Sequence, residues 1–267
     1  MSAIRLVAFD LDGTLIGRDM TVRPRVIAAI EKMREAGVAG AIATGRMYRN
    51  AVPFAQGLGF SAPVICYQGA AIVDPGDDRI LREHPLANDA AMDVVRAAHE
   101  WGAYVQLYRD DGYYCEDEDR WAKIYERVSG VRPIVVPSLE EAFAGRSSTK
   151  AVLVVDPADA ERYVAMLRER LGDRAYVTRS YPEFVEIMDP AVDKGDALRW
   201  IADRMGIAMD QVAAIGDAWN DEPLLTAAGF GIAMGSAPQA LRDIADATVG
   251  DLEHDGVAEA IERYVLA

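Results

Sequence analysis

The chain has 267 residues, 51% of them hydrophobic, and it carries 28 Lys+Arg against 43 Asp+Glu, a formal net charge of −15. That length suits two modest domains or one domain with a large insertion. The acidic balance and the lack of any basic run exclude an ordinary nucleic-acid-binding protein. No apolar run reaches the roughly 18 to 20 residues of a membrane span, and no signal peptide precedes the first predicted strand.

The two cysteines, Cys66 and Cys115, do not have the spacing of a metal-binding pair. They allow a single disulfide, but free thiols in a reducing compartment are the favoured interpretation. We therefore expect a cytoplasmic protein without nucleic-acid or membrane partners.

The first third of the chain alternates predicted strands and helices. Residues 4–9 form an apolar run typical of a buried strand, and residues 24–37 carry apolar positions at helical spacing and end at a glycine. Further strands are expected over 38–44 and 62–68. Residues 69–84 place a Pro-Gly-Asp turn between two apolar stretches, which predicts a hairpin.

The end of the chain repeats this alternation. A helix is expected over 193–207, a strand over 211–216 and helical sequence over 220–229, and strands and helices continue to alternate through the last segments. Such alternation implies parallel strands with helices on both faces. The predicted fold class is therefore α/β, with a Rossmann-like parallel sheet as its core.

The middle of the chain has a different pattern. Residues 103–117 predict two strands around Asp-Asp-Gly, residues 149–172 a strand and a helix, and residues 174–189 two strands that are antiparallel if they pair directly. Hairpins mixed with helices indicate an α+β unit. We place this inserted cap domain at 84–187, which leaves 1–83 and 188–267 for the core.

Four clusters of reactive residues, numbered in chain order, follow apolar strands or begin a helix. Asp10 and Asp12 follow the first strand, residues 44–46 the second, Lys194 begins a helix, and residues 216–221 read GDAWND. Each alone has an ordinary interpretation as a turn, a helix cap or a solvated lysine. Because the carboxyl ends of parallel strands line one crevice, all four can meet there. Their joint occurrence favours a functional site.

The residue types point to phosphate chemistry with a metal ion. Four carboxylates (Asp10, Asp12, Asp217 and Asp221) offer oxygen ligands to a hard cation, and Mg²⁺ is the candidate. Such a cation would also offset the repulsion between Asp10 and Asp12, whose side chains point to the same side of an extended chain. Thr44 and Lys194 would then hold phosphate oxygens.

The motifs FDLDGTL, ATGR, DKGDAL and GDAWND resemble the four motifs of the haloacid-dehalogenase-like (HAD) superfamily, in the order and spacing of its Cof-type sugar-phosphatase branch. The resemblance implies that Asp10 is the nucleophile and forms an aspartyl-phosphate. It implies that Asp12 protonates the leaving group and then deprotonates the attacking water. It also implies that Asp217 binds the metal with Asp10 and the backbone carbonyl of Asp12, and that Asn220 and Asp221 support this arrangement.

The substrate contacts are the least determined part of the site. In the branch, Asn commonly stands where this chain has Gln68, and smaller residues stand where it has Trp219. From the resemblance alone, Glu183 and Glu186 of the cap approach substrate hydroxyls. The full set of expected site residues is Asp10 and Asp12 as catalytic groups, Thr44, Gly45, Lys194 and Asn220 for phosphate, Asp10, Asp12, Asp217 and Asp221 for metal, and Arg46, Gln68 and Trp219 as possible substrate contacts.

The resulting prediction is a Mg²⁺-dependent phosphatase for small phosphate monoesters, with sugar phosphates as the candidate class. The resemblance implies that an acid two residues after the nucleophile favours phosphate monoesters over phosphate anhydrides or alkyl halides as substrates. Two alternatives stay open: a phosphomutase of the phosphomannomutase type, and a non-catalytic sugar-phosphate-binding protein. A monomer or a small homo-oligomer is expected.

Overall fold

The structure is a computed structural model that describes residues 3–267, and the chain divides into two compact units. The first, here called the core unit, comprises Met1–Arg82 and Asp193–Ala267. The second, the inserted unit, comprises Glu83–Val192. The return to the core unit comes five residues later than the sequence pattern suggests, because a hydrogen-bonded turn from Asp189 to Val192 follows the last strand of the inserted unit.

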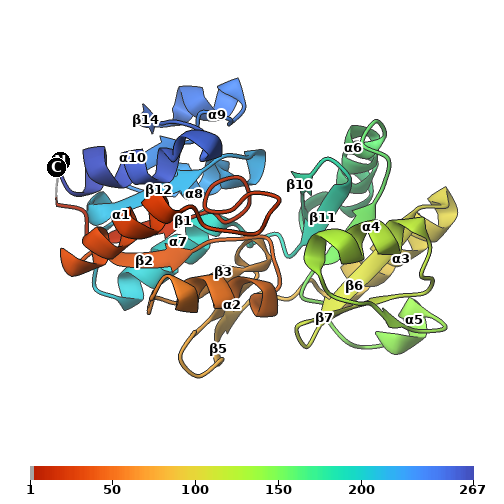
Figure 1. Cartoon of the computed structure of the whole chain (residues 1–267). Coiled ribbons are helices and arrows are strands. Elements are labelled where there is room, and N and C mark those ends of the chain that lie inside the picture. The colour runs from red at the N-terminus through yellow and green to blue at the C-terminus, as the bar shows by residue number, and fades with distance from the viewer. Residues whose placement is uncertain (1–2) are drawn as a thin grey trace. The chain divides into compact units, whose positions relative to one another are not determined.

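The core unit is built on a five-stranded parallel sheet in the order β14-β13-β12-β1-β2 (Figure 1). Strand β1 is central and pairs in parallel with β12 on one side and β2 on the other. All four residues of β1 are buried, as expected for a strand with neighbours on both edges and helices on both faces. The strands are β1 (Leu6–Phe9), β2 (Ala39–Ile42), β12 (Val212–Gly216), β13 (Phe230–Ala233) and β14 (Ala247–Thr248).

Helices cover both faces of this sheet, so the predicted Rossmann-like α/β class is confirmed. Alternate residues of β1 join a buried cluster with α7 (Lys194–Arg204) and α8 (Glu222–Ala227). Helix α1 (Pro24–Glu35) contacts β2 and α10 (Gly256–Ala260), and its buried residues are not part of that cluster. The chain also forms α2 (Tyr48–Gly57), which the sequence pattern did not indicate, and α9 (Gln239–Ile244).

A small three-stranded sheet in the order β3-β4-β5 also belongs to the core unit. Strand β3 (Val64–Cys66) is shorter than the predicted strand, because the chain leaves it through a 3-10 turn, η1 (Tyr67–Gly69). Strands β4 (Ala71–Val73) and β5 (Ile80–Glu83) neighbour each other and confirm the predicted hairpin.

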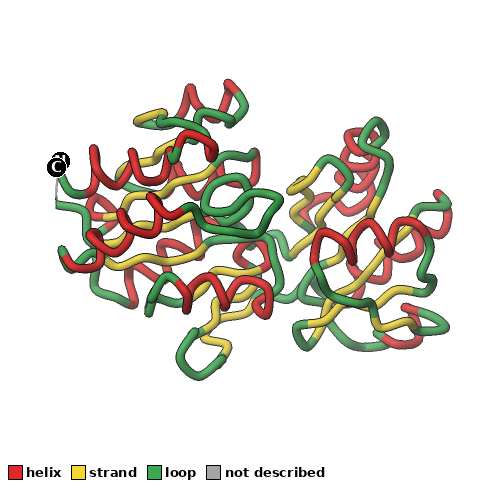
Figure 2. Tube along the Cα trace, in the orientation of Figure 1, coloured by secondary structure: helices red, strands yellow, loops and turns green. Residues whose placement is uncertain are grey.

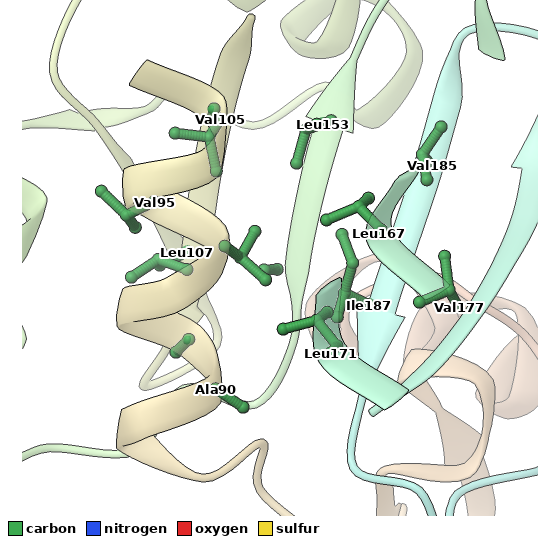
Figure 3. Close-up of a cluster of buried hydrophobic side chains, with 14 of the residues drawn as sticks. Ala90, Val95, Val105, Leu107, Leu153, Leu167, Leu171, Val177, Val185 and Ile187 are labelled. Atoms are coloured by element: carbon green, nitrogen blue, oxygen red, sulfur yellow. The ribbon is translucent and has the colours of Figure 1, made fainter. Parts of the chain in front are cut away.

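The inserted unit has a six-stranded sheet in the order β10-β11-β9-β6-β7-β8, antiparallel except for the β7–β8 pair. The predicted hairpins are confirmed at β6–β7 and β10–β11. Figure 2 shows helices and strands mixed in this unit, and Figure 3 shows apolar side chains of α3 and α6 among those of the strands. The elements are α3 (Asn88–Trp101), β6 (Tyr104–Arg109), β7 (Gly112–Cys115), α4 (Arg120–Ser129), β8 (Ile134–Val135), α5 (Leu139–Ala142), β9 (Ala151–Val154), α6 (Ala160–Leu171), β10 (Tyr176–Tyr181) and β11 (Phe184–Met188).

Two further expectations concern the environment of the chain. Among residues 3–267, no helix is both long enough and apolar enough to cross a membrane. Cys66 lies in the core unit and Cys115 in the inserted unit, and both are buried free thiols.

Candidate active site

The first and fourth sequence clusters come together because their strands are neighbours. Asp10 follows β1 and donates its backbone N–H to the carbonyl of Ile215 in β12, at 2.9 Å. Gly13 has a left-handed φ of 85°, so the chain can turn back after β1 without a side-chain clash. A Cβ at Gly13 would lie 2.3 Å from an oxygen of Asp217. The loops after β1 and β12 are therefore in direct contact.

Lys194 connects these loops to the third cluster. Its side chain is 1% exposed, and its Nζ lies 2.5 Å from Oδ1 of Asp10 and 2.6 Å from Oδ1 of Asp221. Gly195 makes this approach possible, because a Cβ there would lie 2.2 Å from the carbonyl oxygen of Pro223 in α8. The first turn of α7 thus places one cation between two carboxylates.

Asp221 also fixes the loop that carries Asp217. Its Oδ2 accepts hydrogen bonds from the backbone N–H groups of Asp217 and Ala218, each at 3.0 Å. The hydroxyl of Thr14 donates to Oδ1 of Asp217 at 3.0 Å. Thr14 was not singled out from the sequence, although it lies inside the first motif, directly after Asp-Gly. The loop is held at both ends before any ligand binds.

Three carboxylates form a group that could hold a metal ion. One oxygen each of Asp10, Asp217 and Asp221 lies within 4.8 Å of the other two. Burial, and then the charge of Asp221, raises the pKa of Asp10 well above its ordinary value. The same two causes raise the pKa of Asp217 to about 7. Burial alone would lower the pKa of Lys194, but Asp10 and Asp221 outweigh it and raise that pKa, so the ammonium stays charged.

The charge count of this group favours a bound cation. Three carboxylates face one ammonium, which leaves an excess of two negative charges when all are ionised. Oxygen ligands without nitrogen or sulfur suit a hard divalent ion such as Mg²⁺. The donor set therefore fits the predicted ion, and Asp10, Asp217 and Asp221 are the side chains that would hold it.

Asp12 faces a different partner. Its two carboxylate oxygens accept from Nη2 and Nε of Arg46 at 2.5 and 2.7 Å, a bidentate pair. Its side chain is not part of the group of three carboxylates. Arg46, expected as a substrate contact, thus holds the expected acid–base residue. The backbone N–H of Arg46 in turn donates to the hydroxyl of Thr44, at 3.1 Å.

Gln68 is brought to the same place by a strained turn. Tyr67 and Gln68 have φ values of 51° and 61°, in the left-handed region that non-glycine residues rarely occupy. The backbone N–H of Gln68 bonds to the carbonyl of Thr44, and its side-chain carbonyl accepts from the amide of Asn220 at 3.0 Å. A Cβ at Gly45 would lie 2.4 Å from Nε2 of Gln68. The turn therefore joins the second and fourth clusters through two buried amides.

Two further expected contacts, Trp219 and Glu186, have other surroundings. Trp219 is 68% exposed, although its neighbours Asn220 and Asp221 are buried. Glu186 lies in the inserted unit, where it pairs with Lys150 at 2.9 Å and with the hydroxyl of Ser180. Of the residues expected from sequence, the core-unit set is assembled at the carboxyl edge of the parallel sheet.

Fold and site together define a class: α/β proteins with a ligand site at the carboxyl ends of parallel strands, where this chain has three carboxylates that could hold a metal ion. The family of haloacid dehalogenase-like hydrolases matches residues 7–261, so the chain belongs to that family.

Known proteins similar to this chain cover nearly its whole length. It is 29% identical to the pyridoxal phosphate phosphatase of Escherichia coli, over 98% of this chain and 99% of that protein. It is 27% identical to the 5-amino-6-(5-phospho-D-ribitylamino)uracil phosphatase of Bacillus subtilis, over 97% of each. A haloacid dehalogenase-like hydrolase from Bacteroides thetaiotaomicron superposes with a TM-score of 0.86 at 26% identity, covering 97% and 99% of the two chains. The chain is thus an enzyme of this family, a haloacid dehalogenase-like phosphatase.

Proposed function

We propose that this phosphatase hydrolyses small phosphate monoesters, with sugar phosphates as the leading class, in a Mg²⁺-dependent reaction through an aspartyl-phosphate on Asp10. The observation that carries the proposal is the contact of Asp10 with Lys194 inside a group of three carboxylates. This arrangement gives one carboxylate a fixed direction while leaving an excess of negative charge for a cation. Mg²⁺, when bound, would neutralise charge on the carboxylates and on the phosphoryl oxygens.

The contact with Lys194 assigns different roles to the two oxygens of Asp10. Because Oδ1 lies 2.5 Å from the lysine Nζ, Oδ2 is the oxygen with its lone pairs available for phosphorus. Attack by Oδ2 forms the new P–O bond and breaks the ester P–O bond, which releases the alcohol as an alkoxide. Lys194 stays within reach of the transferring phosphoryl group and stabilises its negative oxygens.

Asp12 serves as the acid and then as the base in this scheme. It donates its proton to the leaving alkoxide, and it takes a proton from the water that attacks the aspartyl-phosphate. That second step releases inorganic phosphate and restores the Asp10 carboxylate. Both oxygens of Asp12 accept from Arg46 in the structure, so one of them must leave the guanidinium before Asp12 can carry and donate the proton, while the other keeps the carboxyl oriented.

In this scheme the second cluster and its partners bind the phosphate group. Thr44, Gly45 and Asn220 supply hydroxyl, backbone and amide groups around the bound phosphate, and the turn at Gln68 holds them together. We assign the inserted unit the role of a cap that selects the alcohol part of the substrate. Both relatives named above act on small phosphorylated molecules according to their names, which supports the same class here.

The experiment is a screen of phosphorylated metabolites with Mg²⁺, in which released inorganic phosphate and isomerised sugar phosphate are both measured. Release that stops with a chelator and returns with Mg²⁺ supports the proposal. Isomerisation that requires a bisphosphate activator would indicate a phosphomutase. Tight binding of sugar phosphates without turnover would instead make the chain a binding protein. We also infer a cytoplasmic location and no nucleic-acid or membrane partner, which the acidic charge and two free thiols support.

A further inference from the structure

Trp219 differs from the other tryptophans of the chain. Its side chain is 68% exposed and makes no hydrogen bond, ring contact or cation contact within residues 3–267. The other three are half-buried, and each lies against a ring or a guanidinium: Trp101 against Tyr163, Trp121 against Arg120 and Trp200 against Arg204.

The turn that carries Trp219 also carries Asp221, one of the three carboxylates of the acidic group. Trp219 begins a 3-10 turn, η4 (Trp219–Asp221), whose other two residues are buried. The turn begins after Ala218, the residue that follows Asp217, and its start is fixed by the two hydrogen bonds to Oδ2 of Asp221. The indole is therefore presented to solvent from a rigid loop, two residues beyond a carboxylate that could hold the metal.

A second exposed apolar side chain comes from the neighbouring loop. Met20 is 41% exposed and follows β1, the strand next to β12. Its sulfur lies 3.2 Å from Nη2 of Arg46, the residue that holds Asp12. Each of the two loops that carry the acidic residues thus contains one exposed apolar side chain, Met20 or Trp219. Exposed Trp and Met side chains are typical of surfaces that bind apolar ligand groups.

We propose that Trp219 is a stacking surface for a planar ring in the alcohol part of the substrate, so that the preferred monoesters carry an aromatic or heteroaromatic ring. The inference rests on the proposed phosphatase function and refines its substrate class. A ring that stacks on indole gains from offset packing of two π-systems beyond the area it buries, which a saturated ring does not. Sugar carbons between the ring and the phosphate are compatible with this role.

A matched pair of substrates tests the ring directly. Benzyl phosphate and cyclohexylmethyl phosphate have leaving alcohols of similar size and basicity, and hydrolysis of either breaks the same P–O bond and releases inorganic phosphate. We expect kcat/KM to be about tenfold higher for benzyl phosphate, equivalent to about 1.4 kcal/mol. In Trp219→Leu the ratio of the two kcat/KM values falls to within about twofold of one, whereas Trp219→Phe keeps most of the preference.

The control is Trp200→Leu, on the part of α7 that lies beyond the first turn, which should leave the ratio unchanged. Thermal unfolding confirms that each variant is folded. If the wild-type protein releases phosphate from neither ester nor from any metabolite in the screen, the phosphatase proposal itself fails. If it hydrolyses both esters equally, or if Trp219→Leu lowers both rates by the same factor, the stacking role is wrong although the phosphatase stands.

Discussion

Each unit buries one lysine deeply, and the two lysines have different surroundings. In the inserted unit, Lys150 and Glu186 are 2% and 4% exposed and pair at 2.9 Å. The hydroxyl of Ser180 donates to the other oxygen of Glu186, and the ring of Tyr108 lies 5.0 Å from the lysine Nζ. The charges of this pair cancel within the fold.

In the core unit the charges do not cancel. Lys194 faces Asp10 and Asp221, and Asp217 completes the group of three carboxylates. Burying a charge without a partner is costly, so an uncompensated excess weakens the folded state. Burial as such therefore does not distinguish a structural ion pair from a functional site. The unbalanced charge does, because it leaves a place for a cation and an anionic substrate.

Of the substitutions that distinguish the two lysine sites, Asp10→Asn should have the largest effect. We expect phosphatase activity to fall by at least about 10⁴-fold, because the amide cannot attack phosphorus. The metal-free variant should melt at the same temperature as the wild type or higher, since one repelling carboxylate is gone. Phosphate release measures the activity and differential scanning fluorimetry the melting. Activity within tenfold of wild type would rule out Asp10 as the nucleophile.

Glu186→Gln, in contrast to Asp10→Asn, should lower the stability of the fold. Removing the charge of Glu186 takes away the carboxylate that faces the buried Lys150 ammonium, so the free energy of unfolding should drop by about 3–5 kcal/mol. Urea denaturation followed by circular dichroism measures this loss. The double variant Lys150→Met/Glu186→Leu is the control, and it should recover most of the stability. A single variant as stable as the wild type would show that the pair is not a structural element.

The unbalanced group should also make stability depend on pH. The pKa of Asp217 is 3.8 ordinarily and about 7 in the folded protein, so between these values the folded state holds a proton that the unfolded state has lost. The free energy of unfolding of the metal-free protein therefore falls as pH rises from about 4 to about 7, by roughly 4 kcal/mol at most. The raised pKa of Asp10 acts in the same direction.

Melting temperatures between pH 5 and 8, with a chelator or with Mg²⁺, measure this dependence. The carboxyls of Asp93 and Glu100 have lowered pKa values, so their contribution to stability is lost only as pH falls below the ordinary pKa range of carboxyls. That loss does not overlap with the Asp217 effect, which occurs at higher pH. We expect Mg²⁺ to flatten the profile, because the cation replaces the bound proton, and Asp217→Asn to reduce the slope without metal. A steeper fall in Asp217→Asn would contradict the assignment.

Much of the core could be predicted from sequence because its signals are local. The strands that lead to Asp10 and Asp217 are short apolar runs, and parallel neighbours must end at the same edge. This rule suffices to bring the first, second and fourth clusters together without any knowledge of side-chain contacts, whereas Lys194 begins a helix. The hairpin at β6–β7 was equally readable, since Asp110 and Asp111 both adopt the left-handed φ of 52° that such turns require.

What the sequence did not reveal depends on distant contacts. Helix α2 has no side-chain cap at its first turn and contains Pro53, so neither a start signal nor an uninterrupted pattern marks it. The pairing of Arg46 with Asp12 spans 34 residues, and sequence alone could not choose between that partner and a substrate. The left-handed turn at Gln68 is also unmarked, because only the surrounding fold makes a strained non-glycine residue tolerable there.

The smallest effect concerns Thr14, which sequence analysis passed over although it lies next to Gly13 in the first motif. Thr14→Val keeps the shape of the side chain but removes the hydrogen bond to Asp217, which is worth about 1 kcal/mol. The hydroxyl lowers the pKa of Asp217 against the effect of burial, so its loss should raise that pKa further. The alkaline end of the metal-free stability profile should then move to higher pH, and the apparent Mg²⁺ affinity should weaken about fivefold. Thr21→Val is the control, because its hydroxyl binds Asp19 in an exposed loop. Equal shifts in both variants would show that Asp217 is positioned by the loop backbone and not by Thr14.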